Sequence, residues 1–278
     1  MRVAIAGASG LIGTALRRRL AGDGHEVIRL ERGPGSGYTN LGAAAGVDAL
    51  VNLAGAGIGA HRWTAEYKAT LRASRLEATR LLAGLDVPLL VNASAVGYYG
   101  DRGDELLDET SAPGDDFLAV LCRDWEAAAS SAGGRVVLLR SGMVLSGEGG
   151  ALRKQLPLFK LGLGGHFGDG RQWVSWISLD DEVAAIVHLL TAGVAGPVNL
   201  TSPNPVRNGE LTKALGKALH RPAILPIPAF APRLVLGGEL VDALLLASQR
   251  VVPTRLLESG FTFAHPTLAG ALDAQLGT

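Results

Sequence analysis

The sequence predicts an α/β fold, a doubly wound parallel sheet with a small C-terminal substrate lobe. Strand-like and helix-like segments alternate through the first half of the 278-residue chain, which is typical of a parallel sheet with helices on both faces. The first strand is followed at once by Gly7, Gly10 and Gly13, which lead into a helix. Such a turn places unpaired backbone N–H groups at a helix N-terminus, where a pyrophosphate binds well. These observations predict a Rossmann-type domain.

The expected elements follow from apolar runs and helical periodicity. We expect strands over residues 2–6, 26–30, 49–53, 89–93, 135–139 and 198–200. We expect helices over 14–21, 66–82, 117–130, 180–191, 210–219, 234–247 and 268–276, with 234–247 as one packed helix. This order predicts a dinucleotide-binding domain over 1–145, to which 178–200 returns, and a lobe built from 146–177 and 201–278.

The composition limits the classes of function. Lys+Arg and Asp+Glu both number 26, so no net charge favours a nucleic-acid partner. The one cysteine, Cys122, cannot form an internal disulfide, which fits a reducing cytoplasm. We expect no signal peptide and no membrane partner, because no apolar stretch reaches the length of a membrane span. The six histidines are scattered, so we expect no metal site.

Residues at the ends of the first two strands point to a dinucleotide. Gly7 would allow the tight turn, Gly10 the approach of the ligand, and Gly13 close packing of helix on strand. The second strand ends in Glu31 and Arg32. A carboxylate there would bind the ribose hydroxyls of NAD(H), whereas an arginine would bind the 2′-phosphate of NADP(H). The residues alone leave both cofactors open, and either side chain could instead be a surface charge.

Two later strand ends carry further candidates. Asn52-Leu53-Ala54-Gly55 follows the third strand, and its small residues would let a cofactor lie across the backbone. Ser94 and Tyr98 follow the fourth strand. Their hydroxyls could bind a substrate oxygen and move its proton. A tyrosine acting as a base at neutral pH would need a cationic neighbour.

With these motifs the chain resembles the extended short-chain dehydrogenases/reductases, the nucleotide-sugar epimerase group. More narrowly, it resembles the "epimerase family protein" branch, which has its own C-terminal domain. The motifs that carry this resemblance are Asn52–Gly55, Arg62-Trp63, Ser74-Arg75, Tyr98–Gly100, Trp125-Glu126, Arg140–Leu145, Leu161–Gly165 and Gln172–Ile177. They run through nearly the whole chain.

The resemblance implies NADP(H) bound along the edge of the sheet. By matching positions, the pyrophosphate would be held by Gly7, Ser9, Gly10, Leu11 and Ile12, and the 2′-phosphate by Arg32. Leu53 and Ala54 would line the adenine side, Arg75 would reach the phosphates, and Met143 would lie near the nicotinamide. Glu31 departs from the small polar residue expected before the arginine, which keeps NAD(H) open.

The catalytic residues depart from the family pattern. Extended members carry Tyr-x-x-x-Lys on the helix after the serine strand, but here Leu118 and Cys122 stand at those positions. Ser94 and Tyr98 are therefore our candidate catalytic residues. The candidate substrate residues are Tyr99, Gln172, Trp173, Ser175 and Trp176; Tyr98, Tyr99 and the tryptophans could instead be packing aromatics.

Two functions follow as hypotheses. The first is an NADP(H)-dependent oxidoreductase or epimerase acting on a small hydroxylated substrate, with a nucleotide sugar as one candidate. The second is a non-catalytic NADP(H) sensor, because the catalytic dyad is missing. The chain could be a monomer or a homodimer formed through the helices 66–82 and 117–130.

Overall fold

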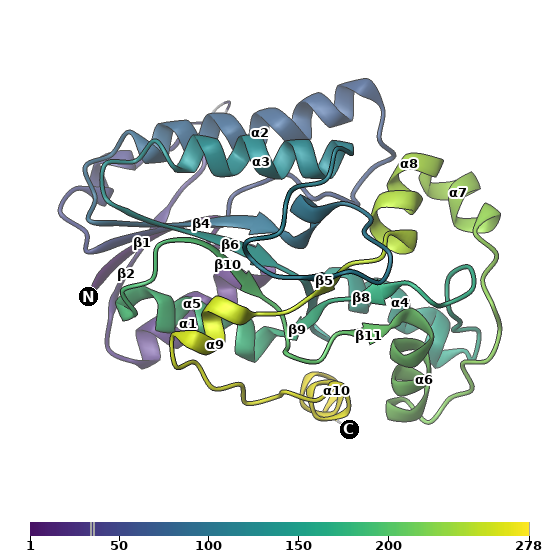
Figure 1. The fold of residues 1–278 in the computed structure, drawn as a ribbon. Coiled ribbons are helices and arrows are strands. Elements are labelled where there is room, and N and C mark those ends of the chain that lie inside the picture. The colour runs from purple at the N-terminus through teal and green to yellow at the C-terminus, as the bar shows by residue number, and fades with distance from the viewer. Residues whose placement is uncertain (34, 36, 278) are drawn as a thin grey trace.

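A six-stranded parallel sheet forms the centre of the computed structural model, which describes residues 1–33, 35 and 37–277. Its strand order is β10-β6-β4-β3-β1-β2 (Figure 1). The strands are β1 (Arg2–Ala6), β2 (Glu26–Leu30), β3 (Ala49–Asn52), β4 (Leu89–Ala95), β6 (Arg135–Ser141) and β10 (Gly196–Leu200). All six were predicted, and the structure confirms a doubly wound α/β fold.

Helices cover both faces of the sheet. The helices α2 (Ala65–Ala83) and α3 (Phe117–Ala129) lie side by side on one face, and α1 (Leu11–Gly22), α5 (Leu179–Thr191) and α9 (Thr254–Glu258) lie on the other (Figure 1). Strand side chains alternate between the faces. Ile5 and Val51 pack in one buried cluster with α1 and α5, while Ala4 and Leu50 pack in a second cluster with α2.

Most of the segments outside the main sheet and its helices lie beyond the carboxyl end of the sheet, where a third cluster of buried residues forms. Three two-stranded sheets lie there, pairing β7 (Met143–Leu145) with β9 (Trp176–Ser178), β8 (Trp173–Val174) with β11 (Val206–Arg207), and β5 (Leu106–Leu107) with β12 (Arg250–Val251). The helices are α4 (Gly150–Lys160), α6 (Asn208–Ala218) and α10 (Leu268–Leu276). Leu152, Trp176 and Leu272 are buried at their centre.

Two of the expected elements differ from the structure by more than two residues at an end. Helix α1 begins at Leu11 rather than Thr14, because Gly10 already has the extended backbone of an N-cap. The single packed helix predicted over 234–247 is wrong. The chain instead forms α7 (Phe230–Leu236), α8 (Gly238–Val241) and a π-helical turn (Asp242–Leu246). Gly237, with φ of +93°, interrupts the helix, and Leu234 is 73% exposed.

Membrane-spanning helices and metal clusters are both absent from residues 1–33, 35 and 37–277. No helix in these ranges is long and apolar enough to cross a membrane. The same residues contain no group of three or more His, Cys, Asp and Glu side chains that could hold a metal ion.

A buried carboxyl group lies between the sheet and α5. The Ser141 hydroxyl donates a 2.6 Å hydrogen bond to Glu182 Oε1. Glu182 is 0% exposed, and its Oε2 has no hydrogen-bond partner. Burial raises the pKa of Glu182 to about 8, because a carboxylate is poorly solvated in this apolar layer.

This raised pKa predicts a pH-dependent stability. The protonated group stabilises the folded state fully below its ordinary pKa of 4.5, and this contribution is lost as the pH rises through about 8. We expect the free energy of unfolding to fall over this interval by at most roughly 1.4 kcal/mol per pH unit. In Glu182→Gln this part of the slope should disappear, because glutamine stays neutral. Urea unfolding of both proteins across this pH interval measures the effect.

Glu258→Gln is the matched control, since Glu258 is exposed, and it should leave the slope unchanged. An unaltered slope in Glu182→Gln would show that another group causes the dependence.

Candidate functional site

The glycine turn after β1 is a tight backbone cradle. Gly7 has φ of +79°, a conformation that favours glycine. The Gly10 N–H donates to the Gly7 carbonyl at 3.1 Å and closes the turn. A Cβ placed on Gly13 would lie 2.2 Å from the Gly7 oxygen, so only glycine lets α1 pack this closely on the strand end.

The turn contacts the second segment predicted to line the cofactor. A Cβ on Gly7 would lie 2.7 Å from the carbonyl of Leu53 and 2.9 Å from the amide nitrogen of Ala54. Asn52 fixes that loop, because its side-chain oxygen accepts from the Ala54 N–H at 3.1 Å. The side chain of Asn52 in turn donates to Asn92 Oδ1 at 2.7 Å. The ends of β1, β3 and β4 are therefore held in one arrangement.

The first turn of α1 has free hydrogen-bond donors. Its N-cap, Gly10, makes no side-chain capping bond, and the first turn contains no acidic residue. Ser9 is exposed beside it, and Leu11 and Ile12 are half-buried and packed on the core. The arrangement suits an anion, since the first backbone N–H groups of a helix have no partner within it.

The predicted 2′-phosphate position lies at the same edge. Leu30 pairs with Ala6 at the end of β2, so the next residues, Glu31 and Arg32, lie beyond the strand end near Gly7. Both side chains are exposed. The Glu31 backbone is fixed by Asn40, whose side-chain oxygen accepts from the Glu31 N–H at 2.8 Å.

Arg75 supplies a cation beside the loop that follows β3. Its side chain packs against the backbone of Gly55, where an added Cβ would lie 3.2 Å from the Arg75 Cζ. Its guanidinium stacks on the Trp125 ring, with Cζ 5.1 Å from the ring centroid. Burial lowers its pKa. Within the described ranges no carboxylate pairs with Arg75, so its charge is free to bind an anion.

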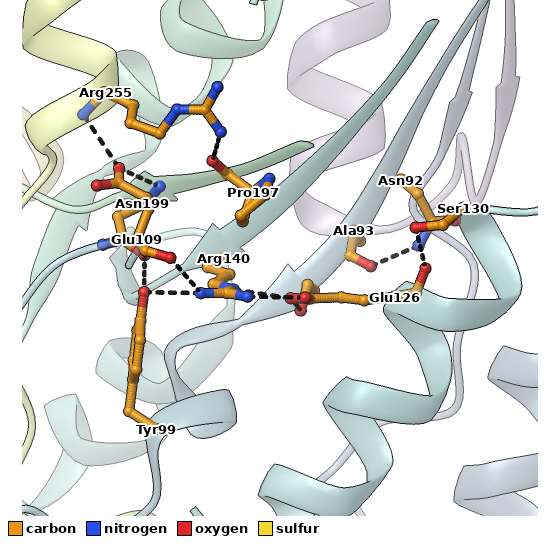
Figure 2. A network of polar contacts seen from close by, with 11 residues as sticks. Asn92, Ala93, Tyr99, Glu109, Glu126, Ser130, Arg140, Pro197, Asn199 and Arg255 are labelled. Carbon is orange, nitrogen blue, oxygen red and sulfur yellow. Dashed lines mark hydrogen bonds and ion pairs between the residues drawn. The ribbon is translucent and has the colours of Figure 1, made fainter. Parts of the chain in front are cut away.

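A buried ion pair lies at the ends of β4 and β6 (Figure 2). Arg140 Nε and Nη2 bind the two oxygens of Glu126, on α3, at 2.8 and 2.9 Å. Arg140 Nη1 donates to the Tyr99 hydroxyl at 3.0 Å, and that hydroxyl donates to Asn199 Oδ1 at 2.7 Å. Burial raises the pKa of Tyr99 to about 12. Tyr99 therefore holds the network together as a neutral donor and acceptor.

Both candidate catalytic residues contact this ion pair. The Ser94 hydroxyl donates to Glu126 Oε1 at 2.7 Å. The Arg140 Cζ lies 3.5 Å from the centroid of the Tyr98 ring, a cation–π contact. Tyr98 is half-buried, and its hydroxyl has no hydrogen-bond partner in the described part of the chain. The structure thus groups Ser94 and Tyr98 around one guanidinium and leaves the phenol free.

The positions of the missing dyad are filled by apolar groups. Leu118 is 8% exposed and Cys122 is 4% exposed. Both pack against Gly97, where an added Cβ would lie 3.3 Å from Leu118 Cβ and 4.0 Å from the Cys122 sulfur. Burial, followed by the nearby Glu126 carboxylate, raises the pKa of the Cys122 thiol to about 12. Cys122 is therefore a neutral thiol.

Most of the predicted substrate residues are packed within the protein. Trp176 is 0% exposed and donates its indole N–H to the Asn204 carbonyl. The Gln172 amide donates to the Leu245 carbonyl at 2.8 Å. The Ser175 hydroxyl donates to the Gln249 carbonyl at 2.7 Å. The polar hydrogens of these side chains are thus used internally, as they are in Tyr99.

Trp173 and Met143 are more open. Two guanidinium groups lie over the Trp173 ring, with the Cζ of Arg207 4.1 Å and that of Arg250 4.6 Å from the ring centroid. Its indole N–H donates to Asp104 at 3.0 Å. Arg250 Nε is buried without a hydrogen-bond partner. Met143, on β7, is half-buried, and its backbone N–H donates to the Ser175 carbonyl.

Sequence reasoning missed Glu126, Arg140 and Arg250 as site residues. A signal was present for Arg140, which ends the apolar run of β6, because a charge in a buried strand needs a partner. Glu126 likewise stands among apolar residues on α3. Nothing local in the sequence pairs the two.

Two family models match separate parts of the chain. Residues 3–201 match the model of the NAD dependent epimerase/dehydratase family. Residues 227–275 match a domain of unknown function. The first match contains the glycine turn, Ser94, Tyr98 and the Glu126–Arg140 pair.

Relatives are similar along the whole chain. An epimerase family protein of Mycobacterium tuberculosis is 46% identical over 97% of this chain and 96% of its own length. The crystal structure of human epimerase family protein SDR39U1 with NADPH is 37% identical, with a TM-score of 0.93 and full coverage of both chains. UDP-glucuronic acid 4-epimerase from Bacillus cereus, at 15% identity and a TM-score of 0.79, shares the fold. The chain belongs to the NAD-dependent epimerase/dehydratase family.

Proposed function

We propose that this protein binds NADP(H) across the carboxyl end of its sheet and is an oxidoreductase or epimerase acting on a small hydroxylated substrate. The glycine turn carries the proposal: Gly13 and Gly7 leave no room for a side chain, and the uncapped start of α1 leaves backbone donors for a pyrophosphate. The residues present therefore fit a dinucleotide. A bound nicotinamide would supply hydride exchange with a substrate carbon.

The charges at this edge favour NADP(H) over NAD(H). Arg32 lies beyond the end of β2, where a 2′-phosphate is bound in such folds. Arg75 adds a cation without a carboxylate partner beside Gly55. The human relative, 37% identical, has NADPH in its crystal structure. Glu31 would repel a 2′-phosphate, so Arg32 has to turn toward the ligand and Glu31 away from it.

Tyr98 is our candidate for moving the substrate proton. Of the hydroxyls around Arg140, only that of Tyr98 has no hydrogen-bond partner among the described residues. The Arg140 guanidinium lies against the Tyr98 ring and favours negative charge on the phenol oxygen during proton transfer. Ser94 was expected to orient the substrate oxygen. Since its hydroxyl hydrogen is bonded to Glu126, we assign it the positioning of Glu126 instead.

The substrate would carry an anionic group near Trp173. Arg250 stacks on this ring and pairs with no carboxylate among the described residues. Its buried Nε lacks an acceptor, which a phosphate or carboxylate oxygen would supply. Gln249, the preceding residue, donates to the Gly100 carbonyl, so Arg250 lies close to the segment that carries Tyr98. A nucleotide sugar satisfies this requirement with its diphosphate.

One observation favours the second candidate function, an NADP(H)-binding sensor without turnover. Leu118 and Cys122 replace the tyrosine and lysine of extended members, and both are buried and uncharged. Such a protein would keep the glycine turn and lose catalysis. The Tyr98 experiment below separates the two functions.

Gly13→Ala tests the cofactor site. The added methyl would lie 2.2 Å from the Gly7 carbonyl oxygen, so the turn must open, and we expect NADPH affinity to fall more than about tenfold. Fluorescence titration with NADPH measures this. Gly22→Ala is the matched control on the same helix, since its Cβ would meet nothing within 4 Å. Equal affinities in the two variants would place the cofactor elsewhere.

Tyr98→Phe tests the catalytic assignment. With the proton-transfer group removed, we expect kcat to fall by about 10²- to 10⁴-fold, while NADPH affinity is kept. Turnover is followed as NADPH oxidation with a panel of phosphate- or carboxylate-bearing carbonyl compounds. Tyr99→Phe is the control, because that phenol is buried in the ion-pair network. It should lower stability by about 1–3 kcal/mol with kcat largely retained.

Loss of turnover in Tyr98→Phe supports the enzyme. NADPH binding by the unaltered protein without oxidation of any compound in the panel supports the sensor.

Arg250→Met tests the anionic subsite. Methionine keeps part of the stacking on Trp173 but removes the charge, so KM for an anionic substrate should rise by about 10- to 100-fold with a smaller change in kcat. Arg207→Met is informative as a control, because Arg207 already pairs with Asp104 at 2.8 Å. An equal KM in Arg250→Met and the unaltered protein would contradict the assignment.

A further inference from the structure

Two segments that are distant in sequence carry basic residues and no acidic residue. Residues 149–168 and 211–238 contain no Asp or Glu, although the chain has 26 acidic and 26 basic residues. The basic residues in these segments are Arg153, Lys154, Lys160, Lys213, Lys217, Arg221 and Arg233. The segments comprise most of α4 and α6, the loops after them, and α7, and they lie at the end of the molecule opposite the N-terminus (Figure 1).

The two segments are in direct contact. Arg221 Nε donates to the Lys160 carbonyl at 3.0 Å. The Ile227 N–H donates to the His166 carbonyl at 2.8 Å. The backbones also approach at Gly165, where an added Cβ would lie 1.6 Å from the Leu225 carbonyl oxygen. The two segments are therefore neighbours in the fold.

Both segments also carry large apolar side chains that are exposed to solvent. The exposed members are Leu158, Leu161, Leu163, Ile224, Leu225, Phe230, Leu234, Val235 and Leu236. Ile224 is 81% exposed, and Leu161 and Leu234 are each 73% exposed. Phe230 and Leu234 are four positions apart on α7 and so share one helix face. Exposed apolar groups gathered in this way mark a binding surface.

The charges on this surface indicate what it binds. Lys160, Lys213 and Lys217 are exposed and have no carboxylate partner among the described residues; Arg233 is the exception, since it pairs with Asp242. A symmetric dimer through this face would bring the unpaired lysines of two copies together, which is unfavourable. A partner that is negatively charged and can also bury apolar side chains is complementary to these residues. An anionic lipid surface has both properties, since its headgroups are negative and its acyl layer is apolar.

We infer that this surface, defined as the exposed apolar and basic side chains of residues 149–168 and 211–238, docks the protein peripherally on anionic membranes. Ile224, Leu225 and the outer face of α7 enter the interfacial layer, and the lysines lie at the level of the lipid phosphates. This mode of binding needs no spanning helix. It differs from the expectation from sequence that the chain has no membrane partner, which rested on the length of apolar stretches.

Co-sedimentation of the full chain with vesicles tests the inference. We expect binding to mixed phosphatidylglycerol–phosphatidylcholine vesicles, weaker binding at high salt, and little binding to phosphatidylcholine alone. The double variants Ile224→Ser/Leu234→Ser and Lys160→Gln/Lys217→Gln should each weaken binding by about tenfold or more. Thermal unfolding and NADPH titration verify that the variants fold.

Matched controls change exposed residues of the same character, apolar or cationic, elsewhere. Leu81→Ser/Leu257→Ser removes exposed leucines on α2 and α9, and Arg18→Gln/Arg80→Gln removes exposed arginines on α1 and α2. Both should bind vesicles like the unaltered protein.

Three results would overturn the inference. The first is no binding to the anionic vesicles. The second is equal loss of binding in the surface variants and the controls. The third is a concentration-dependent dimer in analytical ultracentrifugation that Ile224→Ser/Leu234→Ser dissociates, which would make this face an interface between copies of the chain.

Discussion

The buried guanidinium of Arg140 is the group on which the carboxyl edge of the sheet depends. Its side chain is 4% exposed, and that of Glu126 is 9% exposed. An arginine at this depth without a carboxylate would cost several kcal/mol. Pairing with Glu126 meets this requirement and holds α3 within hydrogen-bond distance of β6. The Tyr99 hydroxyl accepts a further hydrogen bond from Arg140 and donates one to Asn199. It therefore also links β6 to β10.

The same constraint positions the candidate chemistry. The hydrogen bonds to Glu126 and Tyr99 hold the Arg140 guanidinium in one orientation. The ring of Tyr98 stacks on it and leaves its phenol free beside the strand ends. In extended members a lysine on the helix after the serine strand provides the positive charge near the tyrosine. Here the charge comes from a strand, and Cys122 occupies the lysine position as a neutral thiol. A positive charge is thus present beside the tyrosine, but it belongs to Arg140 on β6 rather than to a lysine on the helix.

Much of the fold could be predicted from local patterns. β-branched runs identified the six strands of the sheet, and the spacing of Gly7, Gly10 and Gly13 identified the turn, because both signals lie within a few residues. The rule that parallel strands end at one edge predicted that the loop after β3 lines the cofactor, and the structure places Leu53 and Ala54 in contact with Gly7.

What could not be predicted depends on contacts distant in sequence. Glu126 and Arg140 pair only because α3 packs over β6, and Arg250 reaches Trp173 only because β12 returns beside β5. The helix expected over 234–247 failed because apolar composition alone does not distinguish a buried helix from an exposed one. Gly237 was the local sign of the break.

Titration of the full chain with NADPH and, separately, with NADH at equal ionic strength tests the central claim most directly. The arrangement of Arg32 and the glycine turn predicts NADPH affinity of about micromolar and NADH binding more than about tenfold weaker, because only NADPH has a 2′-phosphate. Tighter binding of NADH would make Glu31 the residue that binds the ribose and contradict the cofactor assignment. Binding of neither would show that the turn serves the fold alone.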